Sequence, residues 1–193
     1  QLNEIFALYD ELSGDDQQLV DLSPCAALLN QMDGMGSAEL SAGFDPAADK
    51  LKLYENQSYK TAYLVNQPLT IVMNGYTMTG SASATIQIAQ AGALYFMGGG
   101  TVISTKGVGV EVQSGGSLCI EEPDVTVQGN TYALRIAPDA EVHLSAGTYS
   151  GNTAAIQMEN GDFSALLEPG YTYYDDAGKP ISPSDMAAAK KIT

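Results

Sequence analysis

Short pieces in which apolar and polar residues alternate fill the chain from about Lys50 onward, and Gly, Asn and Ser residues separate them. Alternation at every second residue is typical of β-strands with one buried face. The pieces form three families. The first comprises Tyr63-Leu64-Val65, Ile86-Gln87-Ile88, Val110-Glu111-Val112, Leu134-Arg135-Ile136 and Ile156-Gln157-Met158; the second Leu69–Ile71, Leu94-Tyr95-Phe96, Leu118-Cys119-Ile120 and Val142-His143-Leu144; the third Tyr76-Thr77-Met78, Thr101-Val102-Ile103, Val125-Thr126-Val127 and Gly147-Thr148-Tyr149.

The spacing within each family is regular. The last residues of the pieces step by 23, 24, 24 and 22 in the first family, by 25, 24 and 24 in the second, and by 25, 24 and 22 in the third. Three short strands per repeat predict the rung of a parallel β-helix, whose strands stack on their equivalents roughly 4.8 Å away. A β-sandwich would not require a constant three-strand period. We therefore predict a mainly β, right-handed, single-stranded parallel β-helix of about five rungs over residues 46–181.

The alternation also assigns the two faces of each strand. One predicted inward stack consists of Ile86, Ile88, Val110, Val112, Leu134, Ile136, Ile156 and Met158, and a second of Leu94, Phe96, Leu118, Ile120, Val142 and Leu144. The residues between them point outward in two columns: Gln87, Glu111, Arg135 and Gln157 in the first family, and Tyr95, Cys119 and His143 in the second.

The two ends of the chain follow other patterns. Residues 1–45 predict a helical segment, with apolar residues at helical spacing and a Ser23-Pro24 helix start. Because an open β-helix exposes strand edges, we expect this segment to cap its N-terminal end; an independent binding module is the alternative. At the other end, Asp176-Ala177-Gly178 predicts the turn of a closing hairpin, and residues 182–193 predict a short helix from Ser184 through Ala189 and a tail.

Two segments resemble known sequences. The run Leu69-Thr70-Ile71-Val72-Met73-Asn74-Gly75-Tyr76-Thr77-Met78-Thr79-Gly80 resembles a rung of pectate-lyase-like β-helix proteins, although many of those carry Asp where this chain has Val72. The run from Leu166 to Ile181 resembles the end of β-helix domains in secreted or surface proteins of gut Gram-positive bacteria, and residues 9–29 resemble small helical modules of such proteins. The resemblance implies an extracellular or cell-surface location and this fold, and it says little about activity.

Charge restricts the partners. The chain has 23 acidic and 8 basic residues, a formal net charge of -15, and only 16% charged residues. Nucleic acids and anionic membranes attract basic surfaces, so we expect neither as a partner. The sequence contains no apolar run long enough to span a membrane and no signal peptide, so we expect any leader to lie outside it. We expect Cys25 and Cys119 to be two thiols, with a disulfide between them as the alternative.

β-Helix enzymes that act on acidic polysaccharides need clustered acids with a base, or two carboxylates across the scissile bond. From Thr61 to Thr105 the chain has no charged residue. Further along, Glu111 and Arg135 lie one rung apart, which is the pattern of a surface ion pair; as a lyase base, Arg135 would lack a calcium cluster. The sequence therefore predicts no catalytic residue and leaves the question of enzymatic activity open.

The remaining candidate is a run of acids, Glu121-Glu122-Pro123-Asp124, at a turn between strands. We expect a solvated turn, with a Ca²⁺ site formed by Glu121, Glu122 and Asp124 as the alternative, and no other cofactor. The pair Cys119 and His143 has nucleophile and base chemistry but no evident orienting group, so we interpret it as a semi-exposed row.

These observations predict a non-catalytic extracellular scaffold or adhesion module. The alternatives are a carbohydrate-binding module and a β-helix polysaccharide lyase or hydrolase. If the module binds a glycan, a host or cell-surface protein, or a neighbouring domain of a longer chain, we expect the contact at the outward side chains Tyr95, Gln87, Glu111, Arg135, Gln157 and His143. Tyrosine suits such contacts because it combines a flat apolar ring with a hydroxyl group.

Overall fold

The computed structural model describes residues 44–45, 50–159, 162–166 and 170–193. The predicted helical segment 1–45 lies outside these residues except for its last two. Those two, Phe44–Asp45, form strand β1, which pairs antiparallel with β2. The domain boundaries predicted at residues 45 and 46 therefore stay a prediction.

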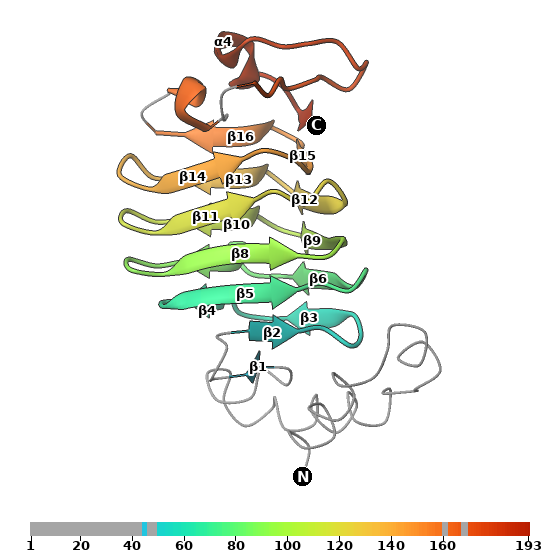
Figure 1. Ribbon diagram of the computed structural model, residues 1–193, viewed down its shortest axis with the longest axis vertical. Coiled ribbons are helices and arrows are strands. Elements are labelled where there is room, and N and C mark those ends of the chain that lie inside the picture. Colours follow the sequence, from blue (N-terminus) through green and yellow to red (C-terminus); the bar gives the residue numbers. More distant parts are fainter. Residues whose placement is uncertain (1–43, 46–49, 160–161, 167–169) are drawn as a thin grey trace.

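Fifteen strands from Lys50 to Met158 wind into a β-helix of five turns (Figure 1). Each turn contributes one strand to each of three parallel sheets. The first sheet contains β2 (Lys50–Lys52), β5 (Pro68–Val72), β8 (Ala93–Met97), β11 (Ser117–Ile120) and β14 (Glu141–Leu144). The second contains β3 (Gln57–Tyr59), β6 (Thr77–Gly80), β9 (Gly100–Ser104), β12 (Val125–Gly129) and β15 (Thr148–Gly151), and the third contains β4 (Tyr63–Val65), β7 (Ala84–Ile88), β10 (Val108–Val112), β13 (Tyr132–Ile136) and β16 (Ala154–Met158).

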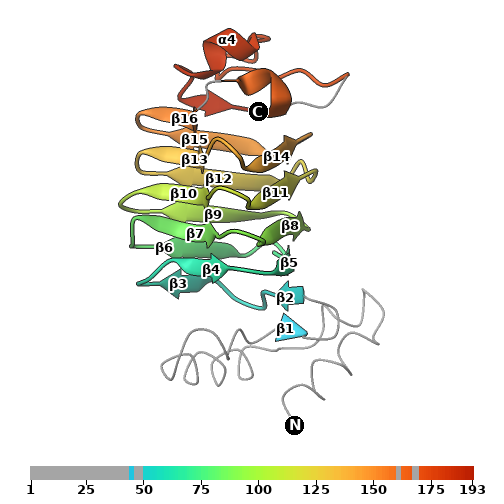
Figure 2. The same cartoon turned by 90° about the vertical axis from the view of Figure 1, so that its left-hand side faces the viewer.

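The predicted β-helix is thus confirmed, including its number of turns. In Figure 1 the chain crosses the front from left to right along β8, returns behind through β9 and β10, and rises toward the C-terminus, which is a right-handed coil. Figure 2 shows the strands of each sheet stacked in columns along the axis. Right-handedness is the rule for parallel strands joined by a crossover.

The core consists of the inward side chains of the three sheets. In the β4–β16 sheet, the register joins Ile86, Val110, Leu134 and Ile156 in one buried row. In the sheet of β2, β5, β8, β11 and β14, called the β5–β14 sheet below, Leu94 and Leu118 are paired and buried. Both predicted inward stacks are confirmed, with the exception that Met158, at the end of its row, is half-buried. Each buried aliphatic side chain contributes about 1.5–3 kcal/mol by leaving water, so the stacking of rungs is the main stabilising force.

The predicted register of the third family was wrong by one residue. Met78 pairs with Val102, and Val102 with Val127, whereas the sequence spacing had aligned Ile103 with both. Val102 is fully buried and Ile103 is partly exposed. Thr101-Val102-Ile103 carries β-branched residues on both faces, so its alternation does not distinguish the inward position.

The β-helix also begins earlier than the three families indicated. Leu51 of β2 pairs with Ile71, and Ser58 of β3 pairs with Thr79, so the first turn is only 20 to 21 residues from the second. Leu51 and Leu53 are buried in the same core. The shorter turn kept these strands outside the repeat of 22 to 25 residues.

The turns between the strands contain residues that can adopt the backbone conformations required there. Asn74 and Gly75 both have positive φ, and the Asn74 side chain donates a hydrogen bond to the carbonyl of Leu53 one turn below (2.9 Å). Gly129 has no room for a Cβ, which would lie 1.6 Å from the carbonyl oxygen of Tyr132. The fully buried Thr85 hydroxyl donates to the carbonyl of Ile103 (2.8 Å), so this inward polar group is satisfied.

The C-terminal end of the β-helix is closed by several small elements. The 3₁₀-helix η2 (Phe163–Leu166) packs against β14, and β17 (Lys191–Ile192) pairs antiparallel with β15. Helix α4 spans only Pro183–Met186, shorter than the helix predicted to run to Ala189.

The hairpin predicted between these elements is confirmed. Tyr174 bridges Pro180 antiparallel, and Gly178 takes a positive φ in the turn. The Asp175 carboxylate fixes that turn by accepting hydrogen bonds from the backbone N–H groups of Ala177 (2.9 Å) and Lys179 (2.8 Å).

Candidate functional site

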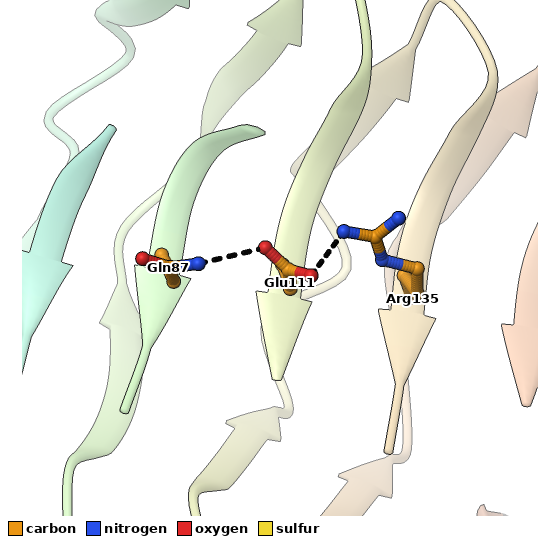
Figure 3. A network of polar contacts seen from close by, with 3 residues as sticks. All are labelled: Gln87, Glu111 and Arg135. Atoms are coloured by element: carbon orange, nitrogen blue, oxygen red, sulfur yellow. Dashed lines mark hydrogen bonds and ion pairs between the residues drawn. The ribbon is translucent and has the colours of Figure 1, made fainter. Parts of the chain in front are cut away.

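Three polar side chains on the outer surface of the β4–β16 sheet form a network across three turns (Figure 3). Gln87, Glu111 and Arg135 occupy equivalent positions of β7, β10 and β13, because the register pairs each with the next. The Gln87 amide donates to one carboxylate oxygen of Glu111 (2.9 Å), and the Arg135 guanidinium forms an ion pair with the other. The predicted neighbours Glu111 and Arg135 are therefore in contact.

This arrangement leaves Glu111 poorly suited to acid–base catalysis. Its side chain is only 14% exposed, and both of its oxygens are engaged by neighbours on either side. A glycosidase needs two carboxylates that face each other across the substrate, whereas this carboxylate faces an amide and a guanidinium. The positive charge of Arg135, 38% exposed, is matched by Glu111, so the network is electrically neutral.

The column continues above and below this network. Gln157 of β16 is paired in register with Arg135 and is half-buried at the last turn. Leu64 of β4 is paired in register with Gln87 at the first turn, and 54% of it is exposed. The four predicted outward residues from Gln87 to Gln157 thus lie side by side, as expected, and an apolar side chain extends the column at its lower end.

A second group of polar side chains lies on the outer surface of the β5–β14 sheet. The Tyr95 hydroxyl donates to Glu121 (2.7 Å), and the Cys119 thiol donates to the other carboxylate oxygen (3.7 Å). His143, which is exposed, is the register neighbour of Cys119 on the next turn. The hydrogen bond to Glu121, with partial desolvation and the nearby acidic groups, raises the pKa of Tyr95 to about 12.

Two of the three acids that were candidates for a Ca²⁺ site have different neighbours. Glu121 is engaged by Tyr95 and Cys119, whereas the Asp124 side chain lies near Gly99, where a Cβ would approach it to 2.7 Å. Across the described ranges from residue 44 to residue 193, no three His, Cys, Asp or Glu side chains gather closely enough to hold a metal ion. Cys25, the other cysteine, lies outside those ranges.

Sequence reasoning missed a cavity at the C-terminal end of the β-helix. It has a volume of about 310 Å³ and lies between the last strand, β16, and helix α4. Gln157 lines it together with Ile156 and Met158 of the same strand, and Phe163, Pro183 and Ala187 form the other walls. The fold brings β16, Phe163 and α4 together around this cavity, so no local sequence pattern could have indicated it.

No known protein family, curated protein or solved structure matches this sequence. Within the part of the chain that the structure describes, no helix is both long enough and apolar enough to cross a membrane.

Proposed function

We propose that this chain is a non-catalytic extracellular scaffold or adhesion module. The observation that carries the proposal is the neutral network of Gln87, Glu111 and Arg135, in which the carboxylate on the outer surface of the β4–β16 sheet is occupied by neighbours from the adjacent turns. Hydrogen bonds between successive turns hold a stack together, whereas a catalytic carboxylate must be available to substrate.

The extracellular part of this proposal rests on composition and on the resemblance of the rungs. Ser, Thr, Asn, Gln and Tyr supply most of the polar side chains, and only 16% of residues are charged. A rigid coil of stacked rungs suits a spacer because each turn contacts only its neighbours and length grows with the number of turns.

One observation favours a carbohydrate-binding module as the second candidate. Thr77, Thr101, Thr126 and Thr148 are register neighbours on four successive turns, so their outward side chains form a column of hydroxyl groups. Strands β3, β6, β9, β12 and β15 contain no charged residue. A neutral, hydroxyl-rich surface on a protein of net charge -15 suits an uncharged glycan better than an acidic one.

A glycan array combined with a turnover assay separates these candidates. The purified protein is applied to neutral and acidic glycans, and released reducing ends are measured in parallel. We expect no turnover and no saturable binding, as for a scaffold. Saturable binding without turnover that is lost in Thr126→Lys, but kept in the exposed-turn control Asn130→Lys, would replace the scaffold with a carbohydrate-binding module; turnover of any glycan would overturn the proposal.

A further inference from the structure

The three sheets of the β-helix end differently at the C-terminal side. The β5–β14 sheet is covered by η2, and the Tyr173 hydroxyl donates to the carbonyl of Leu144 in β14 (3.4 Å). The β3–β15 sheet gains an antiparallel strand, β17. The β4–β16 sheet ends at β16, which the described tail touches through one backbone hydrogen bond, from Ala155 to Ala189 (2.7 Å), before the cavity opens beside it.

The backbone hydrogen bonds between turns indicate which way the carbonyl of Met158 in β16 faces. The carbonyls of Ile88, Val112 and Ile136 accept hydrogen bonds from Gln113, Ala137 and Glu159, each one turn further along the axis (2.9, 2.9 and 3.2 Å). Met158 is the next residue in the same register row. Its carbonyl therefore points to where the next turn would be, and no described residue donates a hydrogen bond to it.

The cavity borders the last strand of the sheet. Ile156, Gln157 and Met158 of β16 line it, together with Phe163 and with Pro183 and Ala187 from the segments that follow. Its volume of about 310 Å³ is at the lower end of the range that binds ligands. An extended segment laid beside Met158 would continue the stack of five strands at that end of β16, whereas Ala155 at the other end is already bonded to Ala189.

The charges beside the cavity indicate what sort of segment fits. Glu159 follows the floor residue Met158, Asp185 lies in α4 between wall residues, and both are exposed. Lys190 and Lys191 of the tail lie at the same end, but the net charge of -15 on the whole chain attracts a basic partner and repels an acidic one.

We propose that the open edge of β16 binds an extended, basic peptide segment of a partner protein as a sixth parallel strand of the β4–β16 sheet. The segment carries an apolar side chain, which packs in the cavity against the half-buried Met158. Its backbone donates a hydrogen bond to the Met158 carbonyl, as Glu159 does to Ile136. This inference goes beyond the scaffold function and gives the module a defined attachment point.

The first test uses a peptide that copies the strand already stacked below β16. The probe is a fluorescein-labelled peptide of the sequence TYALRIA, which reproduces residues 131–137 and contains a basic residue between two apolar ones. Fluorescence polarisation with the whole protein should show saturable binding. Since Ala137 donates its N–H to Val112 in the chain, N-methylation of the last alanine of the peptide should weaken binding about tenfold.

A matched control removes an N–H that faces the other way. Neighbouring residues of a strand direct their N–H groups to opposite sides, so N-methylation of the isoleucine in the peptide should leave the dissociation constant within about twofold. Equal weakening by both methylations would overturn the strand-addition geometry.

Two protein variants locate the binding site. Ala187→Trp fills the cavity and should weaken peptide binding about tenfold, whereas Ala188→Trp, an exposed neighbour that does not line it, should not. Glu159→Lys changes an exposed side chain, leaves the fold intact and should weaken binding several-fold at low salt. Absence of saturable binding to the wild-type protein, or binding that neither Ala187→Trp nor Glu159→Lys changes, would contradict the proposal.

Discussion

The inner and outer residues of one strand, β13, play opposite parts in this molecule. Leu134 is fully buried and touches the equivalent residues of the turns below and above, whereas Arg135, its neighbour, is 38% exposed and pairs with Glu111. The first contact is apolar and removed from water; the second is polar and screened by water. The inward rows therefore hold the β-helix together. The outward column pairs opposite charges and aligns each turn with the next.

The largest effect should come from a charge placed in an inward row. Ile136→Asp buries a carboxylate in the fully buried core and should unfold the domain, at a cost of more than about 4 kcal/mol. Gln157→Asp makes the same kind of change at a half-buried outward position and should alter the free energy of unfolding by less than about 1 kcal/mol. Urea unfolding followed by circular dichroism measures both.

Comparing Ile136→Asp with Gln157→Asp controls for a general intolerance of the fold to mutation. Similar losses of stability in the two variants would mean that the inward and outward positions of these strands are not different in kind, and the face assignment would fail.

A milder change at an inward position sharpens the comparison within β13. Leu134→Ala removes buried methyl groups and leaves a cavity between two turns, so it should lower the free energy of unfolding by about 2–5 kcal/mol. Arg135→Ala, one residue away, should cost less than about 1 kcal/mol. Equal costs in thermal or urea unfolding would show that the outward column contributes as much as the core.

Alkaline pH should lower the free energy of unfolding through the buried tyrosines. Burial raises the pKa of Tyr149 well above its usual value, and burial does the same for Tyr173. Because the folded-state pKa exceeds the unfolded value near 10, their contribution to stability is complete below about pH 10 and is lost as pH rises toward the folded-state pKa. Unfolding free energies measured across this alkaline range should therefore fall.

The control is the conservative change to phenylalanine. Tyr149→Phe loses the hydrogen bond to the Ala146 carbonyl (2.5 Å), so it should be less stable at neutral pH but less sensitive to alkali. Tyr95→Phe loses the hydrogen bond to Glu121 but should change both values less than Tyr149→Phe does, because that bond lies on the outer surface, where water screens it. An alkaline fall in stability that Tyr149→Phe leaves unchanged would contradict the assignment.

The smallest effect concerns the network itself. Glu111→Gln removes the charge that faces Arg135 and should lower the free energy of unfolding by at most about 1 kcal/mol, since part of the pair is exposed to water. The loss should shrink further in high salt. A salt-independent loss of several kcal/mol would indicate that the outer column, and not only the core, holds the turns in place.

Much of this fold could be predicted because the inward rows repeat. Ile86, Val110 and Leu134 recur at a constant spacing with polar neighbours, so both their register and their buried side follow from the sequence. Val102 and Ile103 are both β-branched and apolar, so alternation there could not tell the buried residue from the exposed one.

The remaining features depend on contacts between distant segments. Glu121 accepts a hydrogen bond from Tyr95 of the preceding turn, and no local sequence spacing indicates that bond. The pairing of Lys191–Ile192 with β15 involves only two residues, too few to show a pattern. The cavity beside β16 arises where α4 stands away from the last strand, which only the assembled chain can show.

The most direct test of the account is turnover of acidic polysaccharides by the wild-type protein and Glu111→Gln, assayed in parallel for released reducing ends. We expect no turnover above the protein-free blank for either protein, because Glu111 is held by Gln87 and Arg135 as part of the stack. Turnover by the wild-type protein that disappears in Glu111→Gln would show that the carboxylate acts on substrate, and it would contradict the structural role assigned to the outer column.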